Sequence, residues 1–78
     1  MPKAADIEKT IRGDEFYSRL AIPLCFPLYC LKGEAGLRKQ YMKEGSQDMD
    51  ETTFQEMVSQ CSQVMDVYQI ILERSSSS

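Results

Sequence analysis

The sequence contains no histidine and no tryptophan, and only 3 of its 78 residues are cysteine. Without histidine, the most common general base and the most common nitrogen ligand of metals are both missing. No glycine-rich segment matches the phosphate-binding patterns of nucleotide-binding proteins. A chain of this length also has little room for a deep pocket, which takes about 300 Å³ or more. We therefore expect a protein that is not an enzyme and that holds no cofactor.

Basic residues are scarce in the second half of the chain. Residues 45–78 carry 1 basic and 6 acidic side chains, against 8 basic and 6 acidic in residues 1–44, and the net charge is −3. Nucleic-acid binding needs clustered lysine and arginine, because most of the affinity comes from phosphate contacts. A helix-turn-helix reader is therefore not expected: the second helix would have to read the DNA, and it lacks a basic residue before Arg74.

The three cysteines are Cys25, Cys30 and Cys61. Their odd number, and a charged N-terminal segment without an apolar signal core, predict free thiols in an intracellular, reducing compartment, the cytoplasm or nucleus. Cys25 and Cys30 lack the partners that a zinc site needs, so no metal is expected. The acidic residues near Asp50 also fail the calcium-loop pattern. A redox switch through Cys25 and Cys30 remains an alternative, whereas Cys61 is expected in the core.

Apolar residues recur at spacings of 3 and 4 between residues 54 and 72, and this predicts a long helix with one buried face. Thr53 and Glu56 fit a capping box at its start, with Asp50 as the alternative cap. The helix is expected to end near Glu73 or Arg74. The stripe consists of Phe54, Val58, Cys61, Met65, Tyr68 and Leu72, widened by Met57, Val64 and Ile71.

Two shorter stretches also have helical spacing. Residues 4–12 predict one helix that ends at Gly13, after which Asp14 is a candidate cap for a second short helix over residues 15–21. One helix kinked at Gly13 is the alternative, and the interruption is favoured because glycine is costly inside a helix. Residues 34–44 predict a third helix, with Gly45 as its terminator. The basic residues of this helix are expected on a solvated face, with an acidic partner as the alternative.

Residues 20–31 form a stretch of twelve residues without charge. It is too short to cross a membrane, which takes about 20 apolar residues. Pro23 and Pro27 exclude one continuous helix, although proline is favoured in a first turn. We expect either a buried extended connector or a helix that starts near Pro27. Burial in the core and coverage by a partner are both open for this run.

These elements predict an all-α fold: a small bundle of three to four short helices with a proline-broken apolar segment. A single core in a chain this short supplies only about 3–5 kcal/mol, so completion by dimerisation is an alternative. Residues 1–74 are expected to form a single helical domain. Residues 75–78, four serines, are expected to be a disordered tail.

The function predicted from this fold is protein–protein interaction, as an adaptor or regulatory subunit that buries apolar helix faces against a partner or a second copy. A membrane-surface or lipid-binding module that uses residues 20–31 is the alternative. Val67 and Ile70 are expected on the back of the last helix, where a partner would cover them. The predicted partner-binding residues are Ile22, Leu24, Phe26, Leu28, Val67 and Ile70.

Overall fold

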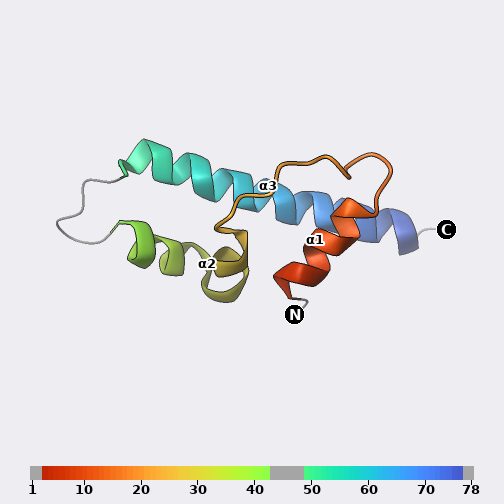
Figure 1. The fold of residues 1–78 in the computed structure, drawn as a ribbon, viewed down its shortest axis with the longest axis horizontal. Coiled ribbons are helices and arrows are strands. Elements are labelled where there is room, and N and C mark those ends of the chain that lie inside the picture. Colours follow the sequence, from red (N-terminus) through yellow and green to blue (C-terminus); the bar gives the residue numbers. More distant parts are fainter. Residues whose placement is uncertain (1–2, 43–48, 77–78) are drawn as a thin grey trace.

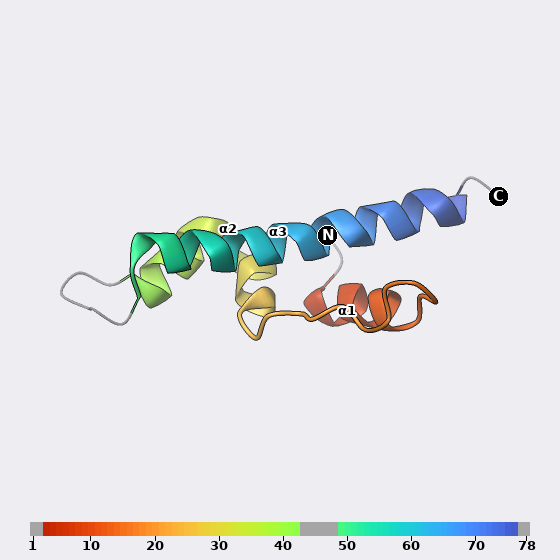
Figure 2. The ribbon, with the colours of Figure 1, turned by 90° about the horizontal axis from the view of Figure 1, so that it is seen from above.

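The computed structural model describes residues 3–42 and 49–76, and these residues form an all-helical bundle. The three helices are α1 (Ala4–Arg12), α2 (Phe26–Tyr41) and α3 (Glu51–Ser76). α2 lies beside the N-terminal half of α3 and α1 beside its C-terminal half, and all three helices contact one another (Figures 1 and 2). The predicted fold class is confirmed. The molecule is elongated, 51 × 22 × 16 Å, because the longest helix sets its axis.

α1 forms where it was predicted and buries Ile7 and Ile11, two positions one turn apart. The helix ends at Arg12, and the N–H of its C-cap, Gly13, donates to the carbonyl of Lys9 (3.0 Å). The predicted second helix over residues 15–21 is wrong, since this segment consists of turns.

The polar groups of that segment are bonded in a way that a helix would not allow. The Asp14 carboxylate accepts hydrogen bonds from the N–H groups of Phe16 (2.8 Å) and Tyr17 (3.0 Å), so it closes a single turn. The Arg12 guanidinium donates to the carbonyls of Ser18 (3.0 Å) and Leu20 (2.8 Å). A helix of seven residues without a buried stripe does not repay its nucleation cost, so the turns persist.

α2 begins at Phe26 with Pro27 in its first turn, as predicted for a helix that starts near that proline. It continues to Tyr41 and so includes most of the helix predicted at residues 34–44. The two parts are joined at Gly33, whose φ of 70° and ψ of −167° are not helical. Glycine adopts this conformation without a side-chain clash, and α2 changes direction there (Figure 1). The predicted terminator Gly45 lies outside the described residues.

α3 starts at Glu51, and its cap is Asp50. The Asp50 carboxylate accepts a hydrogen bond from the N–H of Thr53 (2.7 Å), the third helical residue, so the capping box predicted at Thr53 is wrong and the alternative cap is correct. At the other end the helix runs two residues beyond the predicted limit. Ser75 and Ser76 belong to it, so the predicted disordered tail is helical there, while residues 77–78 lie outside the described residues.

The core lies between α3 and the two shorter helices. The apolar stripe of α3 is confirmed, but its centre is displaced towards the residues predicted to widen it. Ile71 is buried (6% exposed) while its neighbour Leu72 is 41% exposed. The buried core consists of Ile7, Ile11, Cys25, Phe26, Leu37, Phe54, Cys61, Val64, Tyr68 and Ile71.

Candidate interaction surface

The six residues predicted to bind a partner have different environments. Phe26 is 0% exposed, because it is part of the chain's own core, so its inclusion is wrong. Ile22 and Leu28 are half-buried and pack against that core. Leu24 is fully exposed (101%), and Ile70 is 45% exposed.

Val67 does not project from the back of α3 as predicted. It is half-buried and packs against the core. The reason is the displaced stripe. Val67 lies only about 90° from the centre of the five residues of α3 that are buried, counting about 100° per residue; these are Phe54, Cys61, Val64, Tyr68 and Ile71. Ile70 lies about 150° from that centre on the same count and remains exposed.

The structure does not join the two predicted groups into one surface. Ile70 belongs to the half of α3 that lies beside α1, whereas residues 22–28 lead into α2 beside the other half (Figure 1). The group around α2 is the larger one. Leu31, which was not predicted as a site residue, is 77% exposed, and Pro27 is exposed as well. We call Leu24, Pro27, Leu28 and Leu31 the outer α2 surface.

The spacing of these four residues places them together. Leu24, Pro27, Leu28 and Leu31 follow the i, i+3, i+4, i+7 pattern, which spans about 100° of a helix. Cys25 has right-handed α dihedrals and precedes the helix directly, so the count extends back into the turn before it. The same spacing in the sequence would have revealed Leu31 and Pro27.

The opposite side of this helix faces the core. Phe26 and Cys25 are buried, and Tyr29 is half-buried, with its ring stacked on that of Phe26 at 6.4 Å between centroids. On the helical count, the centre of this buried side lies about 160° from the centre of the outer α2 surface. The first two turns of α2 are therefore apolar on both faces. One face is buried, whereas the other is covered only in part, at Leu28.

Backbone hydrogen bonds hold the outer α2 surface in place. The N–H of Phe26 donates to the carbonyl of Pro23 (3.0 Å), which closes the turn that carries Leu24. The N–H of Tyr29 donates to the carbonyl of Cys25 (3.0 Å), which is the first helical bond. The outer α2 surface thus lies on a formed helix whose opposite side packs in the core.

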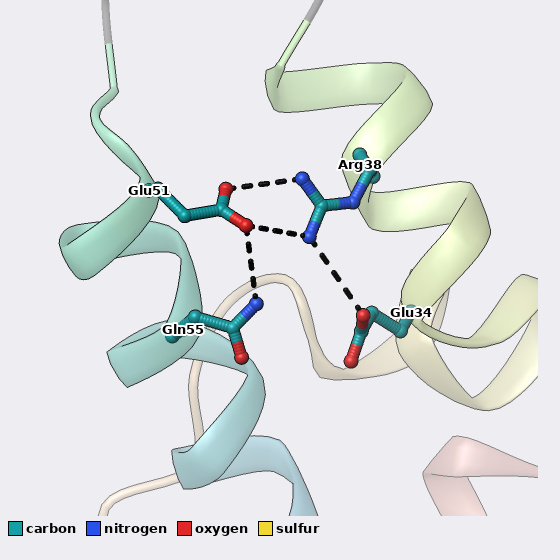
Figure 3. Close-up of polar contacts among 4 residues, drawn as sticks. All are labelled: Glu34, Arg38, Glu51 and Gln55. Carbon is teal, nitrogen blue, oxygen red and sulfur yellow. Dashed lines mark hydrogen bonds and ion pairs between the residues drawn. The ribbon is translucent and has the colours of Figure 1, made fainter.

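A polar cluster joins the other end of α2 to the start of α3 (Figure 3). The Arg38 guanidinium donates to both carboxylate oxygens of Glu51 (2.9 and 3.0 Å) and lies 3.8 Å from Glu34. It also covers the Phe54 ring at 4.5 Å. Arg38 therefore has partners within the chain, so it is not a free basic contact for an acidic partner. The hydrogen bonds that Arg38 donates lower the pKa of the Glu51 carboxyl, and the same bonds raise the pKa of Arg38.

The described residues offer no group of three or more potential metal ligands, and none of their helices is long and apolar enough to cross a membrane. Comparison of the chain with models of protein families, with curated proteins and with solved structures gives no match.

Proposed function

We propose that this chain is a small, non-enzymatic protein–protein interaction module that binds a partner through the outer α2 surface. The observation that supports the proposal is the second apolar face of α2, where Leu24 and Leu31 are among the most exposed large side chains. A helix that is apolar all round is normally buried all round. In this chain, only Leu28 of the outer face is partly covered by the described residues, while Leu24, Pro27 and Leu31 are exposed.

The pattern of this surface favours a protein partner. Anchors at i, i+3, i+4 and i+7 are what a helix presents to an apolar groove or to a second helix. The side chains are held by a structured helix, so binding costs little conformational entropy. Full burial of a leucine contributes about 1.5–3 kcal/mol, so two exposed leucines are a substantial part of a micromolar affinity.

The charge of the chain disfavours the alternative, a lipid surface. Membrane-surface helices combine an apolar face with lysine and arginine on the other face, which attract anionic lipids. The outer α2 surface belongs to the uncharged run of residues 20–31, which has a basic residue only at each end, Arg19 and Lys32. The chain as a whole carries a net charge of −3. A second copy of this chain is the simplest protein partner, because two-fold dimers are the most common oligomers.

The test compares the double variant Leu24→Asp/Leu31→Asp with the wild-type chain. Both residues are exposed, so we expect the circular dichroism spectrum and the melting temperature to stay close to those of the wild type. Sedimentation velocity over a range of concentrations measures self-association, and affinity capture from matched extracts measures binding to other proteins. We expect one of the two to decrease at least tenfold in the variant.

Leu72→Asp is the matched control, because it places the same charge on an exposed apolar residue away from α2 that is not among the predicted partner-binding residues. It should leave both kinds of association unchanged. The proposal is wrong if the double variant retains its fold and binds as the wild type does. It is also wrong if the wild type associates only with vesicles, neutral or anionic, and loses that association in the double variant.

A further inference from the structure

Two of the three cysteines meet in the core although 36 positions separate them. Cys25, at the start of α2, and Cys61, in the middle of α3, have their sulfur atoms 3.6 Å apart, and both side chains are buried. They contact each other as a thiol pair, since both are free. A disulfide needs sulfur atoms about 2.05 Å apart, so a shift of about 1.5 Å would join them.

Cys30 does not take part in this contact. It is half-exposed on α2, five residues after Cys25. Five helical residues rise by about 7.5 Å, whereas a disulfide spans at most about 6.8 Å between Cα atoms. The predicted Cys25–Cys30 switch is therefore excluded as long as α2 is helical, and the third cysteine, expected only as a core residue, replaces Cys30 in the pair.

We propose that Cys25 and Cys61 are a site of oxidative modification, at which a hydroperoxide produces an intrachain disulfide between α2 and α3. In the first step, the Cys25 sulfur attacks the peroxide oxygen, the O–O bond breaks, and a sulfenic acid and an alcohol or water are formed. In the second step, the Cys61 sulfur attacks the Cys25 sulfur, and water leaves. Two thiols lose two electrons and two protons, and the hydroperoxide is reduced.

The surroundings of the pair make this reaction slow and selective. Burial, with the neighbouring Cys25 thiol, raises the pKa of Cys61 to about 12, so Cys61 remains protonated at neutral pH. Oxidation then depends on local opening of the start of α2, which follows a segment of turns, and it becomes faster at alkaline pH. Once formed, the bond fixes the first turn of α2 on α3 and closes a loop of 36 positions.

The fold predicts a different pairing from that of the unfolded chain. With three free cysteines an unfolded chain can form three pairs, and loop-closure entropy favours the nearest, Cys25 with Cys30. The native chain should instead form Cys25–Cys61. The pairing is thus a direct readout of the contact between α2 and α3.

The experiment treats the purified wild-type chain with hydrogen peroxide, in buffer and in concentrated guanidinium, and maps the linked peptides by mass spectrometry after Cys30 and other remaining thiols are alkylated. In buffer we expect Cys25–Cys61 as the main product and a rise in melting temperature on the order of 10 °C that reductant reverses. In guanidinium we expect mainly Cys25–Cys30.

Cys30→Ser should retain the cross-link, and Cys25→Ala should abolish it. The proposal is overturned if native oxidation gives only Cys30-linked dimers, the same mixture as in guanidinium, or sulfinic acid without a cross-link. These measurements on the wild type need neither variant to fold, and they do not depend on any partner.

Discussion

α3 and the first two turns of α2 both bury apolar residues, but they differ in the face that is exposed. The exposed side of α3 carries mainly polar residues such as Gln55, Ser62 and Asp66. The exposed side of α2 at its start carries Leu24, Pro27 and Leu31. A helix with one apolar face is complete once it packs on its own chain, whereas a helix with two has a surface to offer to another molecule.

Truncation of a buried residue of α2 should have the largest effect on stability, and it tests the difference between the two faces of this helix. Phe26→Ala should destabilise the chain by about 3–5 kcal/mol, which is as much as a core of this size supplies. The chain should then be largely unfolded at 25 °C. Leu24→Ala, two residues earlier, should change the stability by no more than about 0.5 kcal/mol. Urea unfolding followed by circular dichroism measures both, and equal effects would mean that the two faces of α2 do not differ.

A second pair of alanine variants tests which face of α3 is buried. Ile71→Ala should cost about 2 kcal/mol or more, because a buried side chain leaves a cavity. Leu72→Ala removes an exposed side chain and should cost less than about 1 kcal/mol. The two unfolding midpoints in urea give the comparison. A larger loss for Leu72→Ala would restore the register predicted from the sequence.

Gly33 separates the two-faced part of α2 from the remainder. Gly33→Ala should destabilise the chain by about 1–3 kcal/mol, because an L side chain is strained at a φ of 70°. The space around a Cβ atom at this position is open, so the cost is in the backbone and not in packing. A synthetic chain with D-alanine at position 33 is the matched control and should retain wild-type stability. If both alanines cost the same, the kink is not set by the glycine.

The dependence of stability on pH is expected to be weaker than the effects of these substitutions. The Thr53 N–H lowers the pKa of the Asp50 carboxyl, and Arg38 lowers that of Glu51. A carboxyl whose folded pKa is lowered stabilises the fold at neutral pH and loses this contribution as the pH falls through the folded value, below about pH 4. Both groups are exposed, so water screens their interactions and the contribution is small.

Glu51→Gln should therefore lower the melting temperature by a few degrees at pH 7 and by less at pH 3. Glu34→Gln is the matched control, since Glu34 lies farther from Arg38, at 3.8 Å against 2.9 Å for Glu51. Thermal melts of both variants at the two pH values give the result. An equal loss for Glu51→Gln at pH 3 and pH 7 would contradict an ionic role.

The amino-acid sequence correctly predicts the helices that have a strong periodic pattern or a proline or glycine boundary. α1 could be placed between residue 4 and Gly13, and the start of α2 near Pro27, because backbone chemistry alone sets these limits. The sequence also predicts the apolar stripe of α3, because the spacing of apolar residues shows which of them share a face of a helix. The helix predicted at residues 15–21 does not form, because the segment has a capping residue but no buried face that would stabilise a helix.

Which apolar side chains are buried depends on how the helices pack against one another. Phe26 and Leu24 belong to one uncharged run, and no local property distinguishes the buried residue from the exposed one. Ile71 and Leu72 are adjacent on a stripe wide enough for either centre, and the packing of α3 against the rest of the chain buries Ile71 and leaves Leu72 exposed. The contact of Cys25 with Cys61 likewise depends on how α2 lies on α3. Spacing fixes which residues share a face of one helix, but only the packing of helices decides which face is covered.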